Sequence, residues 1–158
     1  MMLMKAGRCA VAELHDVEAW LSALLSQLEP AARTKMLREV ARDVRRIQQN
    51  NITLQRSPDG TAWEPRRVTA RTKPGRIRRK MFAKLKTAKY LKAQANANQA
   101  EIAFVPGVQK LVSVHHYGLR DRVNRRGLEV KYSERPLLGF NDNTENVIRQ
   151  HLFEWLSN

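Results

Sequence analysis

The sequence predicts an α+β fold: an N-terminal helical hairpin, a small antiparallel β-sheet with a long basic loop, and a C-terminal helix. Apolar residues recur at helical spacing near both ends of the chain, and short apolar runs separated by turn residues fill the middle. A chain of 158 residues suffices for one domain with its own core. We therefore expect a single domain over residues 14–158, after a flexible leader at residues 1–13.

Residues 14–56 are predicted to form the helical hairpin. The apolar face of its first helix is Leu14, Val17, Leu21, Leu24 and Leu28. Pro30 ends that helix, because proline disfavours helical conformation in the residue before it, and can itself occupy the first turn of the next helix. The stripe of the second helix is Leu37, Val40, Val44 and Ile47. Such a hairpin leaves an apolar seam that another element must cover.

Residues 57–76 have no periodicity and are predicted to form an extended loop. The loop opens with the turn residues Pro58-Asp59-Gly60. Trp63 follows the turn by three residues, and we interpret it as an anchor that pins the loop to the helical hairpin rather than as a binding platform. Trp20 and Trp155 lie on helices and are expected to close the two ends of the core.

Residues 77–140 are predicted to be a helix-and-sheet region. Ile77, Met81 and Leu85 share one face of a helix. Strands are expected from about residue 87, at 100–106 after the turn at 95–99, at 110–118 and at 135–140, with a short hairpin around Arg126-Gly127. Pro136 cannot donate to a β-ladder and should begin a strand or lie at an edge. The expected core residues here are Tyr117, Leu137, Leu138 and Phe140.

Residues 141–158 are predicted to form the C-terminal helix. Asp142 and Glu145 have the spacing of a capping box. The apolar side of this helix is Ile148, Leu152, Trp155 and Leu156.

The chain is strongly basic, with a net charge of +14. This predicts an acidic partner, which could be nucleic acid, a membrane surface or an acidic protein. Cys9 is the only cysteine, so an intrachain disulfide and a cysteine-cluster metal site are excluded. The N-terminus has no signal-peptide pattern and no window is apolar enough to predict a membrane span.

The basic residues concentrate in a tract from Arg66 to Lys92, which holds 12 of the 29 basic residues and no carboxylate. The tract could bind phosphates, or it could be a solvated face or an arm that contacts an acidic neighbouring subunit. The candidate contact arm is Trp63, Arg66, Arg67, Arg71, Lys73, Arg76, Arg78, Arg79 and Lys80. A candidate second contact loop contains Arg120, Arg122, Arg125 and Arg126.

No motif predicts an enzyme. His115-His116 is the only histidine pair, and adjacent side chains of a strand point to opposite faces, which disfavours chelation of one metal. We expect structural roles for both, no catalytic or metal-binding residues, and no cofactor. The competing possibility is a metal-dependent enzyme that combines His115 or His116 with Asp121.

Five segments resemble the tail-completion proteins of P2-type contractile-tailed phages, which belong to the broader family of phage virion morphogenesis proteins. The segments are VEAWLSALLSQLEPAAR (17–33), SPDGTAWEPR (57–66), GRIRRKMFAKLKTAKYLKA (75–93), VHHYGLRDR (114–122) and YSERPLLGF (132–140). The resemblance covers about residues 14–157. P-D-G-x-x-W, H-x-Y-G and R-P-L-L-G-F in this order form a specific combination.

The resemblance implies a structural protein of the virion that finishes the head-proximal end of the tail at the neck and prepares it for head–tail joining. It implies a hexameric ring matching the sixfold tail. The implied partners are a tail tube or tail terminator protein and a head-completion or connector protein, with host cytoplasm as the place of assembly. Non-specific contact with phage DNA, but none with a membrane, fits this picture. The alternative is a basic nucleic-acid-binding protein that uses residues 66–92.

Overall fold

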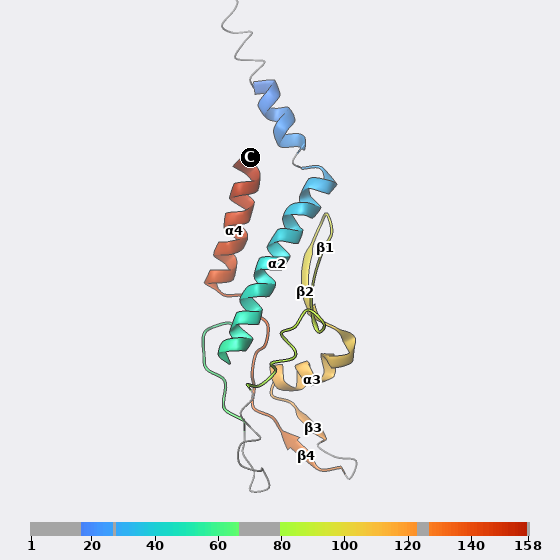
Figure 1. Cartoon of the computed structure of the whole chain (residues 1–158), viewed down its shortest axis with the longest axis vertical. Helices are drawn as coiled ribbons and strands as arrows, with labels where there is room; N and C mark the ends of the chain where they lie inside the picture. The colour runs from blue at the N-terminus through green and yellow to red at the C-terminus, as the bar shows by residue number, and fades with distance from the viewer. Residues whose placement is uncertain (1–16, 27, 67–79, 123–126, 158) are drawn as a thin grey trace, which may run out of the picture.

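A computed structural model describes residues 17–26, 28–66, 80–122 and 127–157. It confirms the α+β class. A helix at residues 17–26 is followed by α2 (Pro30–Leu54), β1 (Leu91–Ala95), β2 (Ala100–Phe104), α3 (Pro106–His116), β3 (Arg120–Arg122), β4 (Glu129–Lys131) and α4 (Asp142–Ser157). In Figure 1, α2 runs through the middle of the molecule, with α4 on one side and the β1–β2 hairpin on the other. Helix α3 and the β3–β4 hairpin lie at the opposite end from the N-terminal helix.

Helix α2 organises the core. Pro30 occupies its first turn, as predicted, and Gln55 ends it in the left-handed conformation, with φ 57° and ψ 44°. In its N-terminal and middle turns, Met36, Val40 and Val44 are buried against Ile148 and Trp155 of α4. A second cluster, below the C-terminal end of α2, joins segments that are distant in the sequence: Ile52, Trp63, Met81, Leu85, Leu91, Phe104, Val112 and Leu137.

The two N-terminal helices exist, but the first does not fold back along the second as a hairpin. The helix at residues 17–26 projects beyond the N-terminal end of α2 (Figure 1). Glu29 is extended, with φ −58° and ψ 145°, as expected for a residue before proline. The expectation that Trp20 closes the core is wrong, because its side chain is 62% exposed. Leu14 and the leader at 1–13 lie outside the described residues.

The prediction of a helix beginning at residue 77 is wrong for the described part of that segment, because residues 81–90 form successive turns. Phe82 has a φ of 59°, which no right-handed helix contains. The side chain of Gln55 holds this segment at the end of α2: its Oε1 accepts from the Met81 N–H at 2.7 Å, and its Nε2 donates to the Met81 carbonyl at 2.9 Å. Met81 and Leu85 are buried as expected, while Ile77 lies outside the described residues.

The segment 110–118 is not a strand, because residues 110–116 belong to α3. Pro106 occupies the first turn of this helix, and Val112 is buried in the lower core. The helix ends at His116 and Tyr117 caps it. The assignment of Tyr117 to the core is wrong, because its side chain is 64% exposed.

The segment 135–140 is also not a strand, because it makes no ladder pairing within the described chain. Leu137 is fully buried and Leu138 is half-buried, as expected, but Phe140 is 72% exposed and does not belong to the core. The buried position of Leu137 is fixed by its N–H, which donates to Nδ1 of His116 at 3.2 Å.

Both predicted hairpins are present, as two separate two-stranded sheets rather than one. In the first, Leu91 pairs with Phe104 and Ala95 with Ala100, and Oδ1 of Asn96 closes the turn by accepting from the Asn98 and Gln99 N–H groups. In the second, Arg120 pairs with Lys131. The predicted C-terminal helix is confirmed as α4.

Candidate functional site: two interaction surfaces

The loop that leads into the basic tract is fixed by Trp63. Its side chain is 6% exposed, and its Nε1 donates to Ser57 Oγ at 3.0 Å and to the Pro136 carbonyl at 3.2 Å. Its ring meets Phe82 edge-on, with the centroids 5.6 Å apart. Trp63 is therefore an anchor, although it holds the loop to the lower core and not to a helical hairpin. A buried indole cannot serve as an exposed contact.

Arg135 is a second anchor of the same loop, and the sequence reasoning missed it. Its side chain is 5% exposed. Nε donates to the Glu64 carbonyl at 2.9 Å, and the terminal nitrogens reach the carbonyls of Ser133 and Pro65 at 3.3 and 3.4 Å. The sequence feature that could have revealed this anchor is the arginine at the start of the apolar run 135–140. A charged side chain beside buried residues needs several hydrogen-bond acceptors. Arg135 and Trp63 together fix where the basic tract leaves the core.

Three of the described basic residues of the tract are exposed around one depression of the surface. Arg66 and Lys80 are exposed, and Lys80 Nζ donates to the Thr53 carbonyl at 2.9 Å. Together with Lys84 they line a depression of about 590 Å³. Its apolar lining comes from Phe82, Leu85, Tyr90, Val108 and Leu111. We call this depression and its three basic residues the basic surface. The remaining arm residues, Arg67, Arg71, Lys73, Arg76, Arg78 and Arg79, lie outside the described residues.

The predicted second contact loop is only partly described. Arg120 and Arg122 are exposed on β3, and Arg122 pairs with Glu129 across the hairpin at 3.5 Å. Asp121, between them, pairs with Lys110 of α3 at 3.0 Å, and the hydrogen bond from Lys110 lowers the pKa of that carboxyl. Arg125 and Arg126 lie outside the described residues.

The histidine pair is built into the packing at the C-terminal end of α3. The His115 ring lies between Phe82 and Tyr132, at centroid distances of 4.9 and 4.7 Å. Burial lowers the pKa of His115, and the positive charges of Arg135 and Arg66 lower it further. Burial also lowers the pKa of His116, while Glu134 opposes the shift. Both rings are therefore neutral at neutral pH.

The described residues hold no group of three or more histidine, cysteine or acidic side chains that could bind a metal ion. No described helix has the length and apolar character that crossing a bilayer requires.

The second surface is apolar and lies at the opposite end of the molecule. On the N-terminal helix and the turn after it, five apolar side chains are 44–62% exposed: Val17, Trp20, Leu21, Leu25 and Leu28. On α4, Leu152, Phe153 and Leu156 are exposed by 38, 69 and 49%. We call these two groups the N-terminal stripe and the α4 face. Uncovered apolar residues gathered on two elements mark an interaction site more often than scattered ones do.

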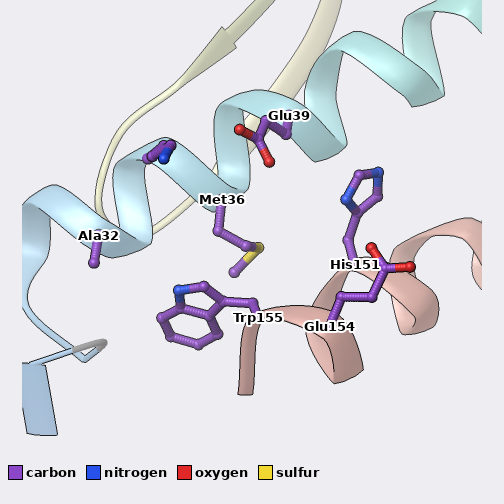
Figure 2. Close-up of a pocket in the computed structure, with 7 residues that line it drawn as sticks. Ala32, Met36, Glu39, His151, Glu154 and Trp155 are labelled. Atoms are coloured by element: carbon purple, nitrogen blue, oxygen red, sulfur yellow. The ribbon is translucent and has the colours of Figure 1, made fainter. Parts of the chain in front are cut away.

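A pocket of about 330 Å³ lies between α2 and α4 near this end. Figure 2 shows Met36 pointing from α2 toward Trp155 of α4, with Glu39, His151 and Glu154 at the rim. His151 Nε2 and Asp43 Oδ2 lie 2.9 Å apart and connect the two helices. The pocket has only three apolar lining residues, so its chemistry is that of a helix–helix groove and not of a small-molecule site.

Comparison with known proteins finds a relative that spans most of the chain. The chain is 38% identical over 146 residues to tail completion protein S of Escherichia phage P2, covering 89% of this chain and 97% of that protein. No solved structure matches it. Residues 12–157 match the sequence description of the phage virion morphogenesis family. That match spans the helices, both hairpins and both interaction surfaces, and the chain belongs to the phage virion morphogenesis family.

Proposed function

We propose that this chain is a structural virion protein that completes the head-proximal end of a phage tail and takes part in head–tail joining as a hexameric ring at the neck. The observation that carries the proposal is the similarity to the P2 tail completion protein, which extends over 97% of that protein's length. A relationship spanning a whole small domain supports a shared role more strongly than a match to one motif does. On this proposal the protein is a virion component that assembles in the host cytoplasm and catalyses no reaction.

The geometry suits a ring. A closed ring uses a heterologous interface, in which two different surfaces of one subunit meet their counterparts on its two neighbours. The N-terminal stripe and the α4 face are two different apolar surfaces of this kind. The basic surface, at the other end of the molecule, is left to contact a different protein.

The partners that fit this arrangement are a tail tube or tail terminator protein and a head-completion or connector protein. Arg66, Lys80 and Lys84 are exposed around an apolar depression, which suits an acidic surface with protruding apolar side chains. Contact through exposed charges predicts association that weakens as salt is added.

Inactivating the gene in the genome that carries it tests the proposal. We expect particles in which filled heads and tails accumulate unjoined, seen by electron microscopy, and recovery of joined particles when the chain is supplied from a plasmid. Normal joined, infectious particles in the absence of the chain would contradict the proposal.

A second candidate function is direct binding of nucleic acid through residues 66–92. The tract holds 12 basic residues and no carboxylate, and DNA passes through the neck of a phage. Its two aromatic residues do not favour this function, because single-strand binding uses exposed rings, whereas Phe82 and Tyr90 are half-buried.

Replacing Arg76, Arg78, Arg79 and Lys80 together by glutamine separates the two functions. If DNA binding is the role, affinity measured at several salt concentrations should fall and its salt dependence should become shallower. If head–tail joining fails while DNA affinity stays unchanged, the nucleic-acid function loses its support.

A further inference from the structure

Within the part of the chain that the structure describes, nothing covers the N-terminal stripe. Its five exposed side chains fall on one side of a helix, because residues 17, 20, 21, 25 and 28 are separated by three, one, four and three positions. An amphipathic helix of this length gains its stability in water by burying such a face, since isolated short helices are marginal. The stripe therefore has the character of one side of an interface, and we expect a partner surface to cover it.

The connection to α2 disfavours covering the stripe within the same chain. The first helix ends in tight turns, where the Leu28 N–H donates to the Leu25 carbonyl at 3.1 Å and the Glu29 N–H to the Ser26 carbonyl at 3.2 Å. Glu29 is then extended because Pro30 follows it. In Figure 1 the helix continues beyond the N-terminal end of α2, past the C-terminal end of α4, and lies alongside neither helix. A short, constrained hinge beside an unpaired element is the arrangement that favours exchange between copies.

Among the described residues, the α4 face is an exposed apolar surface at the same end of the molecule that can match the stripe. Leu152, Phe153 and Leu156 lie within one and a half turns in the C-terminal half of α4 and are exposed. The charges also fit, because Glu18 is the single charged residue among positions 17–28. An apolar helix with one acidic residue and no basic residue is matched by an apolar face and gives no attraction for nucleic acid.

The positions of the two surfaces fit a cyclic assembly. Rotation about an axis parallel to the long axis of the molecule places the same end of every subunit at the same height. The helix at 17–26 and the C-terminal end of α4 both lie at one end of that long axis (Figure 1). A helix that projects from one subunit can therefore reach the α4 face of the next, and the contact repeats around the ring without leaving an open end.

We propose that the helix at residues 17–26 of one subunit, with Leu28 of the turn after it, docks through the N-terminal stripe on the α4 face of a neighbouring copy of this chain. The inference deepens the proposed function and rests on it, since it assigns the contact that closes the ring. Each subunit donates one helix and receives one.

Charge substitutions test the contact. In the variant Leu21→Glu/Leu25→Glu, two carboxylates enter the stripe, and we expect the mass in solution, measured by light scattering, to fall from that of the oligomer to the 18.2 kDa of a single chain. The matched control is Ala19→Glu/Ser26→Glu, which adds the same charge on the opposite side of the same helix and should keep the oligomer. Both variants should keep the far-ultraviolet circular dichroism that α2 and α4 contribute, because those helices do not depend on the stripe. Any loss of signal in Leu21→Glu/Leu25→Glu should be limited to the contribution of the helix at residues 17–26.

Cross-linking identifies the acceptor. In a Cys9→Ser background, one population carries Leu25→Cys and a size tag, and an untagged population carries Phe153→Cys. The two are mixed and treated with a short bis-maleimide, both as purified protein and in isolated tails. We expect a product that contains one tagged and one untagged chain.

Three outcomes overturn the inference: products joining only Leu25→Cys chains to each other, a cross-link within single chains that carry both substitutions, or no mixed product in either preparation. The two charge variants, Leu21→Glu/Leu25→Glu and Ala19→Glu/Ser26→Glu, are also scored for head–tail joining. This measurement separates the proposed contact from the proposed function. A Leu21→Glu/Leu25→Glu chain that stays oligomeric and joins tails contradicts this contact and leaves the proposed function standing. A monomeric variant that still joins tails contradicts the ring itself.

Discussion

Single side chains hold the loop that bears the basic tract. Trp63 and Arg135 come from segments more than 70 positions apart, and both bind main-chain carbonyls at the same place in the lower core. Removing a buried side chain that donates to several carbonyl oxygens lowers stability, because those carbonyl oxygens are then left buried without a hydrogen-bond partner. The rigidity of the loop root therefore depends on very few atoms.

Truncating Trp63 should be strongly destabilising. We expect Trp63→Ala to lower the free energy of unfolding by about 3–5 kcal/mol, through the loss of packing against Phe82 and of two hydrogen bonds. Trp63→Phe keeps most of the ring and should cost about 1–3 kcal/mol. Urea unfolding at one fixed protein concentration measures both, with the 72%-exposed Phe140→Ala as control, expected within about 0.5 kcal/mol of wild type. An equal, small effect of all three substitutions would show that the loop is not anchored here.

Stability should fall as the solution is acidified below neutrality. The pKa values of His115 and His116 are lowered in the folded protein, whereas in the unfolded chain they return to about 6.5. Below about pH 6.5 the two histidines therefore bind more protons in the unfolded state than in the native state. The free energy of unfolding decreases as the pH falls.

Melting temperatures at pH 7.5 and 5.5 test this sign. The wild type should melt lower at pH 5.5. In His115→Phe, which keeps an aromatic ring between Phe82 and Tyr132, the difference between the two pH values should shrink. A difference as large as that of the wild type would mean that His115 does not contribute to it.

At the scale of elements, local signals predicted those elements whose stability is mostly local. The 25-residue α2 followed from its apolar stripe and Pro30, and β1–β2 followed from two short runs around an asparagine turn. The sequence did not predict that residues 81–90 are turns, because their conformation is imposed by Gln55, 26 positions before Met81. Likewise, the segment 135–140 is placed by Arg135 and His116 rather than by strand pairing.

Helix α3 was mistaken for a strand because its apolar run is short and two-sided. Runs of this length do not distinguish a buried strand from a buried helix by periodicity. Pro106 and Gly107 stood before it as the start signal, since proline is favoured in a first helical turn. The basic residues of the candidate site could be identified in the sequence. The exposure of the N-terminal stripe could not, because the same spacing of apolar residues also fits a helix packed in a closed hairpin.

The cap of α4 links that helix to the loop root. Asn141 Oδ1 accepts from the Thr144 N–H and Oγ1, both at 2.8 Å, and its Nδ2 donates to the Pro58 carbonyl. The cap is thus one residue before the predicted Asp142. We expect Asn141→Ala to cost about 1–2 kcal/mol in urea unfolding, because it removes the cap and the link to Pro58. Asn141→Ser retains a capping oxygen and should cost less. Equal stability of the alanine variant and the wild type would show that another group caps α4.

At the scale of the whole molecule, the two surfaces lie at opposite ends and differ in chemistry. The end with the N-terminal helix and the C-terminus of α4 exposes apolar side chains, and the other end exposes Arg66, Lys80 and Arg120. Apolar contacts persist in salt, whereas exposed charge contacts are screened. Subunits that join through the apolar end and meet other proteins through the basic end would assemble first and dock second.

The central claim is that copies of this chain form a ring held by apolar contact, and the mass of the purified protein in solution tests it most directly. Light scattering should give a discrete oligomer near six times 18.2 kDa, at low salt and at high salt alike. A mass of 18.2 kDa under both conditions would contradict a ring that the chain forms by itself.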